Sequence, residues 1–238
     1  MNRRRPADAP DDRPVRWGLG DFVWIYLVGL LLGAVLGQIG RAIAGDPVGE
    51  VGALGTAFAA IGQFGGWVAL IAVVARSKGH SLQEDFGVTL DVADWWAVFA
   101  GMGIFLVSSL LIALPVSLVN ESQKVVQDLE SATGAKLAVF AVIAALVAPF
   151  CEEVLFRGLL LRSLRRRMPP VWAIGVQALV FALAHPLLSP TLGDLAVVPG
   201  LFLLGLVSGV LAEQKGDLSR SILLHIGFNL ITVVSIAL

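Results

Sequence analysis

Long, continuous apolar runs joined by short polar connections dominate the chain from residue 17 onward. Most of the runs are about 20 residues long, which is the length a helix needs to cross a bilayer. They do not alternate between apolar and polar positions, so helices are expected and strands are not. We place the spans near residues 21–43, 54–76, 95–119, 136–157, 171–188, 195–213 and 220–238. The pattern therefore predicts an all-α, polytopic transmembrane helical bundle with about seven spans, eight being the alternative count.

The chain divides into three parts on this reading. Residues 1–16, "MNRRRPADAPDDRPVR", contain five arginines and three prolines but no apolar run, so a disordered cytosolic tail is expected. The segment is not a secretory signal, because the apolar run that follows is too long and no cleavage site closes it. Residues 17–135 then hold the first three spans, and residues 136–238 hold the other four.

Positive charge is distributed unevenly between the two ends of the expected spans. With the N-terminus in the cytosol, only Arg41, Lys124 and Lys136 fall on the outer side, while the remaining lysines and arginines outside the spans face inward. The densest cluster lies at residues 162–167. The positive-inside rule therefore predicts a cytosolic N-terminus and an outer C-terminus.

Composition supports the membrane assignment and limits the possible partners. The chain is 57% hydrophobic and 15% charged, whereas a soluble domain has about 45–50% apolar and 25% charged residues. The net charge of −1 gives no reason to expect nucleic acid. A single cysteine, Cys151, excludes an internal disulfide.

Small residues recur every four positions in two spans. Gly29, Gly33 and Gly37 do so in the first span, and Gly205 and Gly209 do so in the sixth. This spacing lets helix backbones approach closely in lipid. Packing between helices of one chain is the favoured interpretation, and a dimer face is the alternative.

Few ionisable side chains fall inside the spans, and all of them lie in the C-terminal half. Each costs about 2.5–3.5 kcal/mol to insert on translocon scales, so each is a functional candidate. The set, with one buried amide, is Glu152, Glu153, Arg157, His185, His225 and Asn229.

Helix geometry separates the two adjacent acids. Glu153 and Arg157 are four residues apart and share a helix face, so a salt bridge is expected. Glu152 is rotated by about 100° from Glu153, so it stays available. A carboxylate in a low-dielectric pocket without a neighbouring cation suits a general base working near neutrality. Glu152 is the predicted base.

Equal distances along a helical hairpin predict equal depth. Pro169 and Pro170 mark the turn after the fourth span, and Glu153 and His185 are each sixteen residues from position 169. Phe181, one turn before His185, is expected to pack beside it.

The last span contributes a second pair of polar side chains. His225 and Asn229 are four residues apart and share a face near the start of that span. Three helices are therefore predicted to converge on one pocket nearer the cytosolic leaflet.

Four segments in order carry a family resemblance. "EEVLFR" (152–157), "FALAH" (181–185), "FLLGLVSGVLAEQKGDLSRSILLH" (202–225) and "HIGFN" (225–229) resemble the motifs of the CAAX protease and bacteriocin-processing family. This family of intramembrane endopeptidases includes the type II CAAX prenyl endopeptidases. The resemblance covers roughly residues 136–230.

The resemblance implies an activity and a role for each motif residue. Glu152 and His185 match the pair that activates a water, and His225 and Asn229 match the residues that hold the developing oxyanion. The expected reaction is hydrolysis of a peptide bond in a membrane-associated or lipid-anchored protein, without a cofactor. The resemblance also favours a bacterial plasma membrane, with the site toward the cytosolic leaflet. Substrate identity and oligomeric state stay open.

Several alternatives remain beside this hypothesis. Glu152, His185 and His225 are a sufficient ligand set for catalytic zinc, although no HExxH signature is present. A thiol protease using Cys151 is disfavoured because two acids adjoin that residue. A non-proteolytic scaffold or bacteriocin self-immunity protein is the main alternative function. A proton-coupled transporter ranks last, because transporters usually show inverted repeats with discontinuous helices in both halves, whereas all the ionisable groups here lie in the C-terminal half.

Overall fold

Helices form every long element of the chain in a computed structural model, which describes residues 15–119, 134–186 and 195–237. No strand occurs within these ranges, so the all-α prediction is confirmed for them. The first half contains α1 (Leu19–Ala44), α2 (Ala53–Ala60), η1 (Ile61–Gly65), α3 (Gly66–Lys78), α4 (Leu82–Phe86), η2 (Val92–Asp94) and α5 (Trp96–Val119). The second half contains α7 (Gly134–Val142), η3 (Ile143–Val147), α8 (Ala148–Glu153), η4 (Val154–Leu161), α9 (Arg162–Arg165), α10 (Pro170–Ala184), α12 (Val198–Lys215) and α13 (Ser219–Ala237).

The predicted spans correspond to seven helical segments of unequal length. Five segments of the described chain are long and apolar enough to cross a membrane: 19–44, 53–78, 92–111, 134–165 and 198–215. The other two, Pro170–Ala184 and Ser219–Val234, are apolar but shorter. At 1.5 Å per residue, the 15-residue helix α10 reaches about 22 Å, less than the roughly 30 Å hydrocarbon core. The chain is therefore a multi-pass membrane protein, and α10 by itself is shorter than the hydrocarbon core is thick.

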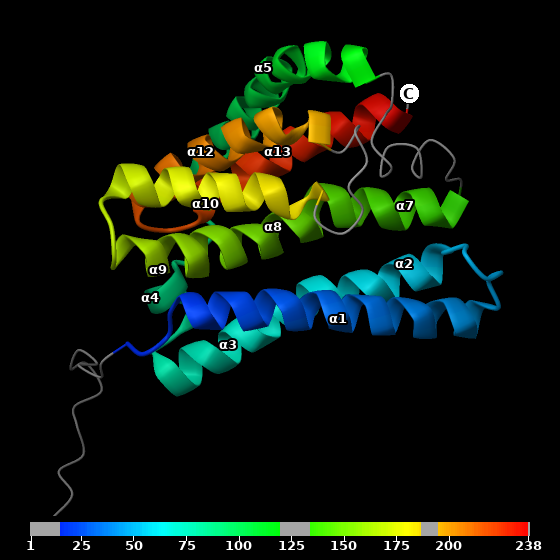
Figure 1. Cartoon of the computed structure of the whole chain (residues 1–238), viewed down its shortest axis with the longest axis horizontal. Coiled ribbons are helices and arrows are strands. Elements are labelled where there is room, and N and C mark those ends of the chain that lie inside the picture. Colours follow the sequence, from blue (N-terminus) through cyan, green and yellow to red (C-terminus); the bar gives the residue numbers. More distant parts are fainter. Residues whose placement is uncertain (1–14, 120–133, 187–194, 238) are drawn as a thin grey trace, which may run out of the picture.

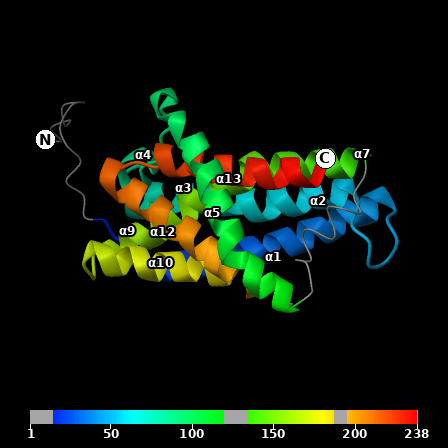
Figure 2. The same ribbon diagram turned by 90° about the horizontal axis from the view of Figure 1, so that it is seen from above.

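The helical segment 134–165 lies at the centre of the assembly. Figure 1 shows it running between α1 to α3 on one side and α10, α12, α13 and α5 on the other. Its η4 part contacts α1, α3, α10 and α12, and its α8 part contacts α13. Seen from above, α5 crosses α12 and α13 steeply (Figure 2) and packs against both. Every residue of η4 is buried, as is Glu153 before it, so residues 153–157 of the "EEVLFR" motif lie in the core and Glu152 is partly buried.

A short helix between the second and third predicted spans, α4, also packs against segment 134–165. α4 brings Phe86 under the arginine-rich end of segment 134–165. The Phe86 ring lies 4.7 Å from the Trp17 ring between centroids. A Cβ on Gly158 would lie 3.2 Å from Phe86 Cβ, so these two elements pack closely.

The N-terminal tail lies almost entirely outside the described residues. Arg16, its last residue, donates its backbone N–H to the carbonyl of Lys78 at 2.7 Å. The end of the tail is therefore tied to the end of α3. Lys124, one of the three basic residues predicted to lie outside, also falls outside the described ranges.

The glycine repeats serve packing between helices of the same chain, as the favoured interpretation predicted. A Cβ on Gly29 would lie 2.1 Å from the Trp67 ring, and one on Gly33 would lie 2.9 Å from Gln63 Cβ. In α12, a Cβ on Gly205 would lie 2.9 Å from Ala178. Each glycine thus allows a neighbouring helix to approach more closely than any side chain would permit.

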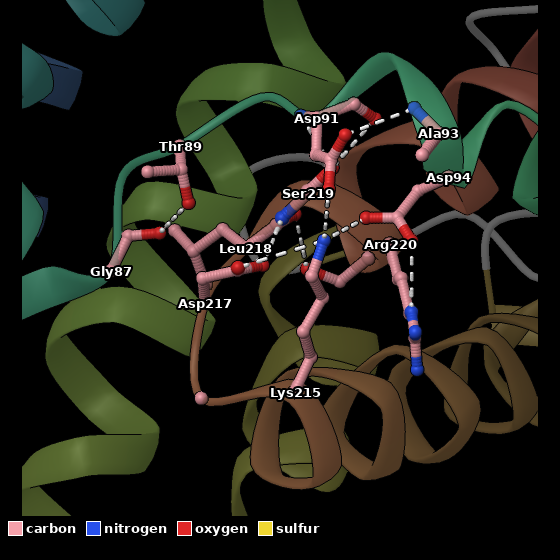
Figure 3. Close-up of polar contacts among 12 residues, drawn as sticks. Gly87, Thr89, Asp91, Ala93, Asp94, Lys215, Asp217, Leu218, Ser219 and Arg220 are labelled. Atoms are coloured by element: carbon pink, nitrogen blue, oxygen red, sulfur yellow. Dashed lines mark hydrogen bonds and ion pairs between the residues drawn. The ribbon is translucent and has the colours of Figure 1, made fainter.

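A polar cluster fixes the start of α13 to the loop before α5 (Figure 3). The buried carboxylate of Asp94 pairs with Lys215 and, at 3.0 Å, with Nε of Arg220. Ser219 Oγ accepts the backbone N–H of Asp91 at 2.8 Å. The pKa of the Asp91 carboxyl is lowered, mainly by the hydrogen bond from the backbone N–H of Ala93 and next by that from Lys215. The cluster therefore joins α5, α12 and α13 at the end where basic residues gather.

The contact between α5 and α13 yields a prediction with an internal control. A Cβ on Gly101 would lie only 1.8 Å from the carbonyl oxygen of Leu224, whereas one on Gly103 in the same helix meets nothing within 4 Å. We expect Gly101→Ala to lower the free energy of unfolding by about 1–3 kcal/mol, because the helices must separate. Gly103→Ala should change it by less than about 0.5 kcal/mol. Thermal unfolding of the detergent-purified variants measures both, and equal effects would contradict this packing.

Candidate active site

The salt bridge predicted from helix spacing is present at the centre of the molecule. Arg157 Nη1 lies 3.0 Å from Glu153 Oε1, and both side chains are completely buried. The Arg157 guanidinium also lies 4.3 Å from the centre of the Phe181 ring and 3.5 Å, through Nη2, from the Gly205 carbonyl. A single buried cation therefore links segment 134–165 to both α10 and α12.

Glu153 has a second partner that sequence spacing could not reveal. Its Oε1 atom lies 2.9 Å from Nδ1 of His225 in α13. Since the carboxylate paired with Arg157 acts as an acceptor, the hydrogen of this bond belongs to Nδ1. Glu153 thus holds the arginine and the histidine together, and Nε2 of His225 faces away from it.

Glu152 occupies a different environment from its neighbour. Its side chain keeps 14% of its surface exposed, and its Oε2 atom lies 3.9 Å from His225 Nε2. That separation is too long for a direct hydrogen bond. Of the two acids, Glu152 is therefore the one without a close ion-pair partner and with part of its side chain exposed.

His185 lies at the end of α10 and is exposed. Its Nδ1 atom lies 2.9 Å from the carbonyl oxygen of Phe181. Because a carbonyl can only accept, Nδ1 carries the hydrogen, and Nε2 of the neutral ring is left as an acceptor. No direct hydrogen bond joins His185 to Glu152, although the structure describes both residues.

The Phe181 ring separates the two imidazoles and confirms the predicted packing. Its centroid lies 4.9 Å from that of His185 and 5.7 Å from that of His225, edge to face in both cases. Arg157 and Phe181, which touch, are each twelve residues from position 169. The two helices of the hairpin are therefore in the register that places Glu153 and His185 at equal depth.

Asn229 is drawn toward the backbone of the neighbouring helix. Asn229 lies one turn after His225 on α13. Its Nδ2 atom donates to the Ala144 carbonyl at 2.7 Å. An amide NH₂ has two hydrogens, so this contact leaves one available.

Tyr26 of α1 is a residue of the site that the sequence analysis missed. Its hydroxyl donates to the carbonyl of Ala184, the residue before His185, at 3.5 Å. Its ring stacks on Trp67 of α3 at 5.7 Å. It is the only tyrosine of the chain, which was the one available signal. The N-terminal helices thus form one wall of the site, in addition to supplying apolar segments.

The three residues of the zinc alternative, Glu152, His185 and His225, are not preassembled around one point. Among the described residues, no three His, Cys, Asp or Glu side chains are grouped so that they could hold a metal ion. His185 and His225 each hold Nδ1 in a hydrogen bond, which leaves Nε2 available, and the Phe181 ring lies edge to face against both imidazoles. Cys151 is a buried free thiol whose side chain faces an apolar groove, so it does not join the acids.

Two cavities approach the polar centre from different surroundings. One, of about 550 Å³, is lined by Arg157 together with Arg162, Arg165 and other polar residues of the basic end. The other, of about 650 Å³, is an apolar groove between α2–α3 and α7–α8 that ends at Phe150 and Cys151. Neither cavity is lined by Glu152, His185, His225 or Asn229; the polar one reaches Arg157, and the apolar one reaches Phe150 and Cys151, which precede Glu152 in the helix.

The comparison with protein families identifies this part of the chain. Residues 134–231 match the family described as type II CAAX prenyl endopeptidase Rce1-like. The family resemblance is thereby confirmed for this segment. All six candidate residues, from Glu152 to Asn229, fall within the Rce1-like segment, whose family consists of CAAX-type proteases acting in membranes. Neither a curated protein nor a solved structure matches the chain.

Because the Glu153–Arg157 pair is buried, removing its cation should lower the stability of the protein strongly. Arg157→Ala leaves the Glu153 carboxylate buried without its main partner, so the free energy of unfolding should fall by about 3–5 kcal/mol. Arg165→Ala removes an arginine from a partly exposed pair with Glu213 and should cost less than about 1 kcal/mol. Chemical unfolding of both variants in the same detergent measures the difference, and similar losses would contradict the assignment of Arg157 as the structural cation.

Proposed function

We propose that the chain is an intramembrane endopeptidase in which Glu152 activates a water to hydrolyse a peptide bond. The observation that carries the proposal is the unequal state of the two adjacent acids. Glu153 is occupied by Arg157 and His225, whereas Glu152 is partly exposed and faces Nε2 of His225 at 3.9 Å. The match of this segment to a family of CAAX-type proteases supports the same reaction.

The first step is proton transfer from water to Glu152. The water donates its second hydrogen to Nε2 of His185, which the Phe181 carbonyl leaves as an acceptor. The water oxygen attacks the carbonyl carbon of the substrate, and the carbonyl oxygen takes up the electron pair. His225, as an imidazolium that keeps its Nδ1–H on Glu153, donates Nε2–H to that oxyanion, and the second N–H of Asn229 donates to it as well.

The second step breaks the carbon–nitrogen bond. The electron pair of the oxyanion re-forms the carbonyl, and the leaving nitrogen takes the proton that Glu152 received from water. Glu152 returns to its ionised form, so the cycle needs no external acid. Glu153 takes no part in these transfers; it positions His225.

The reaction requires water and a place for a membrane-embedded substrate, and each of the two cavities suits one of these. The polar cavity at the basic end gives water a route to Arg157, and the positive-inside rule places this end in the cytosol. The apolar groove beside Cys151 suits the membrane-embedded part of a protein substrate. We therefore infer a membrane-associated or lipid-anchored substrate, cleaved near the cytosolic leaflet of a bacterial plasma membrane.

Replacing the base provides the main test. Glu152→Gln keeps the size of the side chain and removes its ability to accept a proton, so cleavage should fall by at least about a hundredfold. New peptide termini are compared in host membranes that contain equal amounts of wild type or variant. Glu213→Gln, an acid at the surface of α12, is the matched control and should retain the wild-type profile. If the profiles of wild type and Glu152→Gln agree while deletion of the chain still gives a phenotype, a scaffold or self-immunity function replaces the proposal.

The metal-free mechanism makes a separate prediction. Because glutamate and histidine supply the proton transfers, cleavage in purified membranes should survive a strong zinc chelator at its wild-type rate. The measurement is the rate of appearance of the Glu152-dependent termini with and without the chelator. Loss of those termini, followed by recovery on adding zinc, would contradict the mechanism but not the protease assignment.

A further inference from the structure

A proline lies inside the central helix, three residues before Glu152. Pro149 has no backbone N–H, and a proline in a helix interior normally kinks or breaks it. Segment 134–165 nevertheless continues through this position. The preceding stretch, η3 (Ile143–Val147), is π-helical and widens the helix just before the proline.

The π-helical stretch and the proline together leave one carbonyl without a donor from its own helix. In a π-helix each N–H bonds to the carbonyl five residues earlier, and the N–H of Ala148 does bond to Ile143. The next bond in this series would run from residue 149 to Ala144. Since residue 149 is proline, that bond cannot form.

The side chain of Asn229 fills the place of the missing donor. Its Nδ2 atom donates to the Ala144 carbonyl at 2.7 Å, a short distance for an amide hydrogen bond. A carbonyl inside a membrane protein is costly to leave unpaired, so this contact is a strong constraint on α13.

We propose that Pro149 is a positioning residue: by withholding an N–H, it reserves the Ala144 carbonyl for Asn229 and thereby sets the place of that amide relative to Glu152. α13 is then fixed to one helix at two points on either side of Glu152, through Asn229 to Ala144 and through His225 to Glu153. With one hydrogen held by Ala144, the second hydrogen of the Asn229 amide has a fixed direction. This last consequence rests on the proposed function, whereas the coupling between Pro149 and Asn229 does not.

A double-mutant cycle on stability tests the coupling without any substrate. In the wild-type background, Asn229→Ala leaves the Ala144 carbonyl unpaired and should lower the unfolding temperature in detergent by about 3–8 °C. In the Pro149→Ala background, the new backbone N–H at this position is available to the Ala144 carbonyl, so Asn229→Ala should lower it by less than about 2 °C. Equal shifts in the two backgrounds would overturn the proposal.

A second proline serves as the control for that cycle. Pro199 lies in the first turn of α12, where a backbone N–H has no helical acceptor in any case. Asn229→Ala should therefore keep its full effect on the unfolding temperature in a Pro199→Ala background. Suppression by Pro199→Ala as well would show a general effect of removing prolines and would overturn the proposal.

Pro149→Ala alone tests the consequence for catalysis. The variant gives Ala144 a competing donor and frees the Asn229 amide, so the rate at which Glu152-dependent termini appear should fall at least about tenfold. Its unfolding temperature should stay within about 2 °C of wild type. A merely structural proline would change stability and leave the rate per folded molecule unaltered, and that outcome would overturn the positioning role. If no termini depend on Glu152, the proposed function fails, but the stability cycle still decides the coupling.

Discussion

The arrangement of the site depends on one buried carboxylate that serves two partners. Glu153 Oε1 forms an ion pair with Arg157 Nη1 at 3.0 Å and accepts from His225 Nδ1 at 2.9 Å, with all three side chains buried. Arg157 extends the contact to Phe181 and Gly205. Four helical elements therefore meet at Glu153: its own helix, α10, α12 and α13. Buried charges are tolerated only when paired in this way, so removing one member leaves the others uncompensated.

This pairing explains how two adjacent acids can have different tasks. Consecutive residues on a helix point about 100° apart, so the partners that occupy Glu153 do not reach Glu152 in the same way. Glu152 instead keeps part of its side chain exposed, and its Oε2 atom lies 3.9 Å from Nε2 of His225. One acid organises the pocket, and the other remains for chemistry.

Contacts within one helix or one hairpin could be predicted from the sequence. The Glu153–Arg157 bridge follows from a spacing of four, and the contact of Arg157 with Phe181 follows from their equal distance to position 169. Contacts between helices far apart in the chain could not be derived, because spacing does not fix the rotation of one helix against another. The Glu153–His225 bond and the place of Tyr26 belong to this class. The Asn229–Ala144 bond also depends on a π-helical stretch that hydrophobic patterning does not reveal.

The most direct test of this division of labour compares two nearly isosteric changes at adjacent positions. The account predicts that Glu153→Gln lowers the unfolding temperature in detergent by about 10 °C, because the Arg157 charge loses its partner. Glu152→Gln should leave that temperature within about 2 °C of wild type, since no direct hydrogen bond or close ion pair is lost. Equal losses from both changes, or a larger loss from Glu152→Gln, would contradict the assignment of Glu153 as the structural acid.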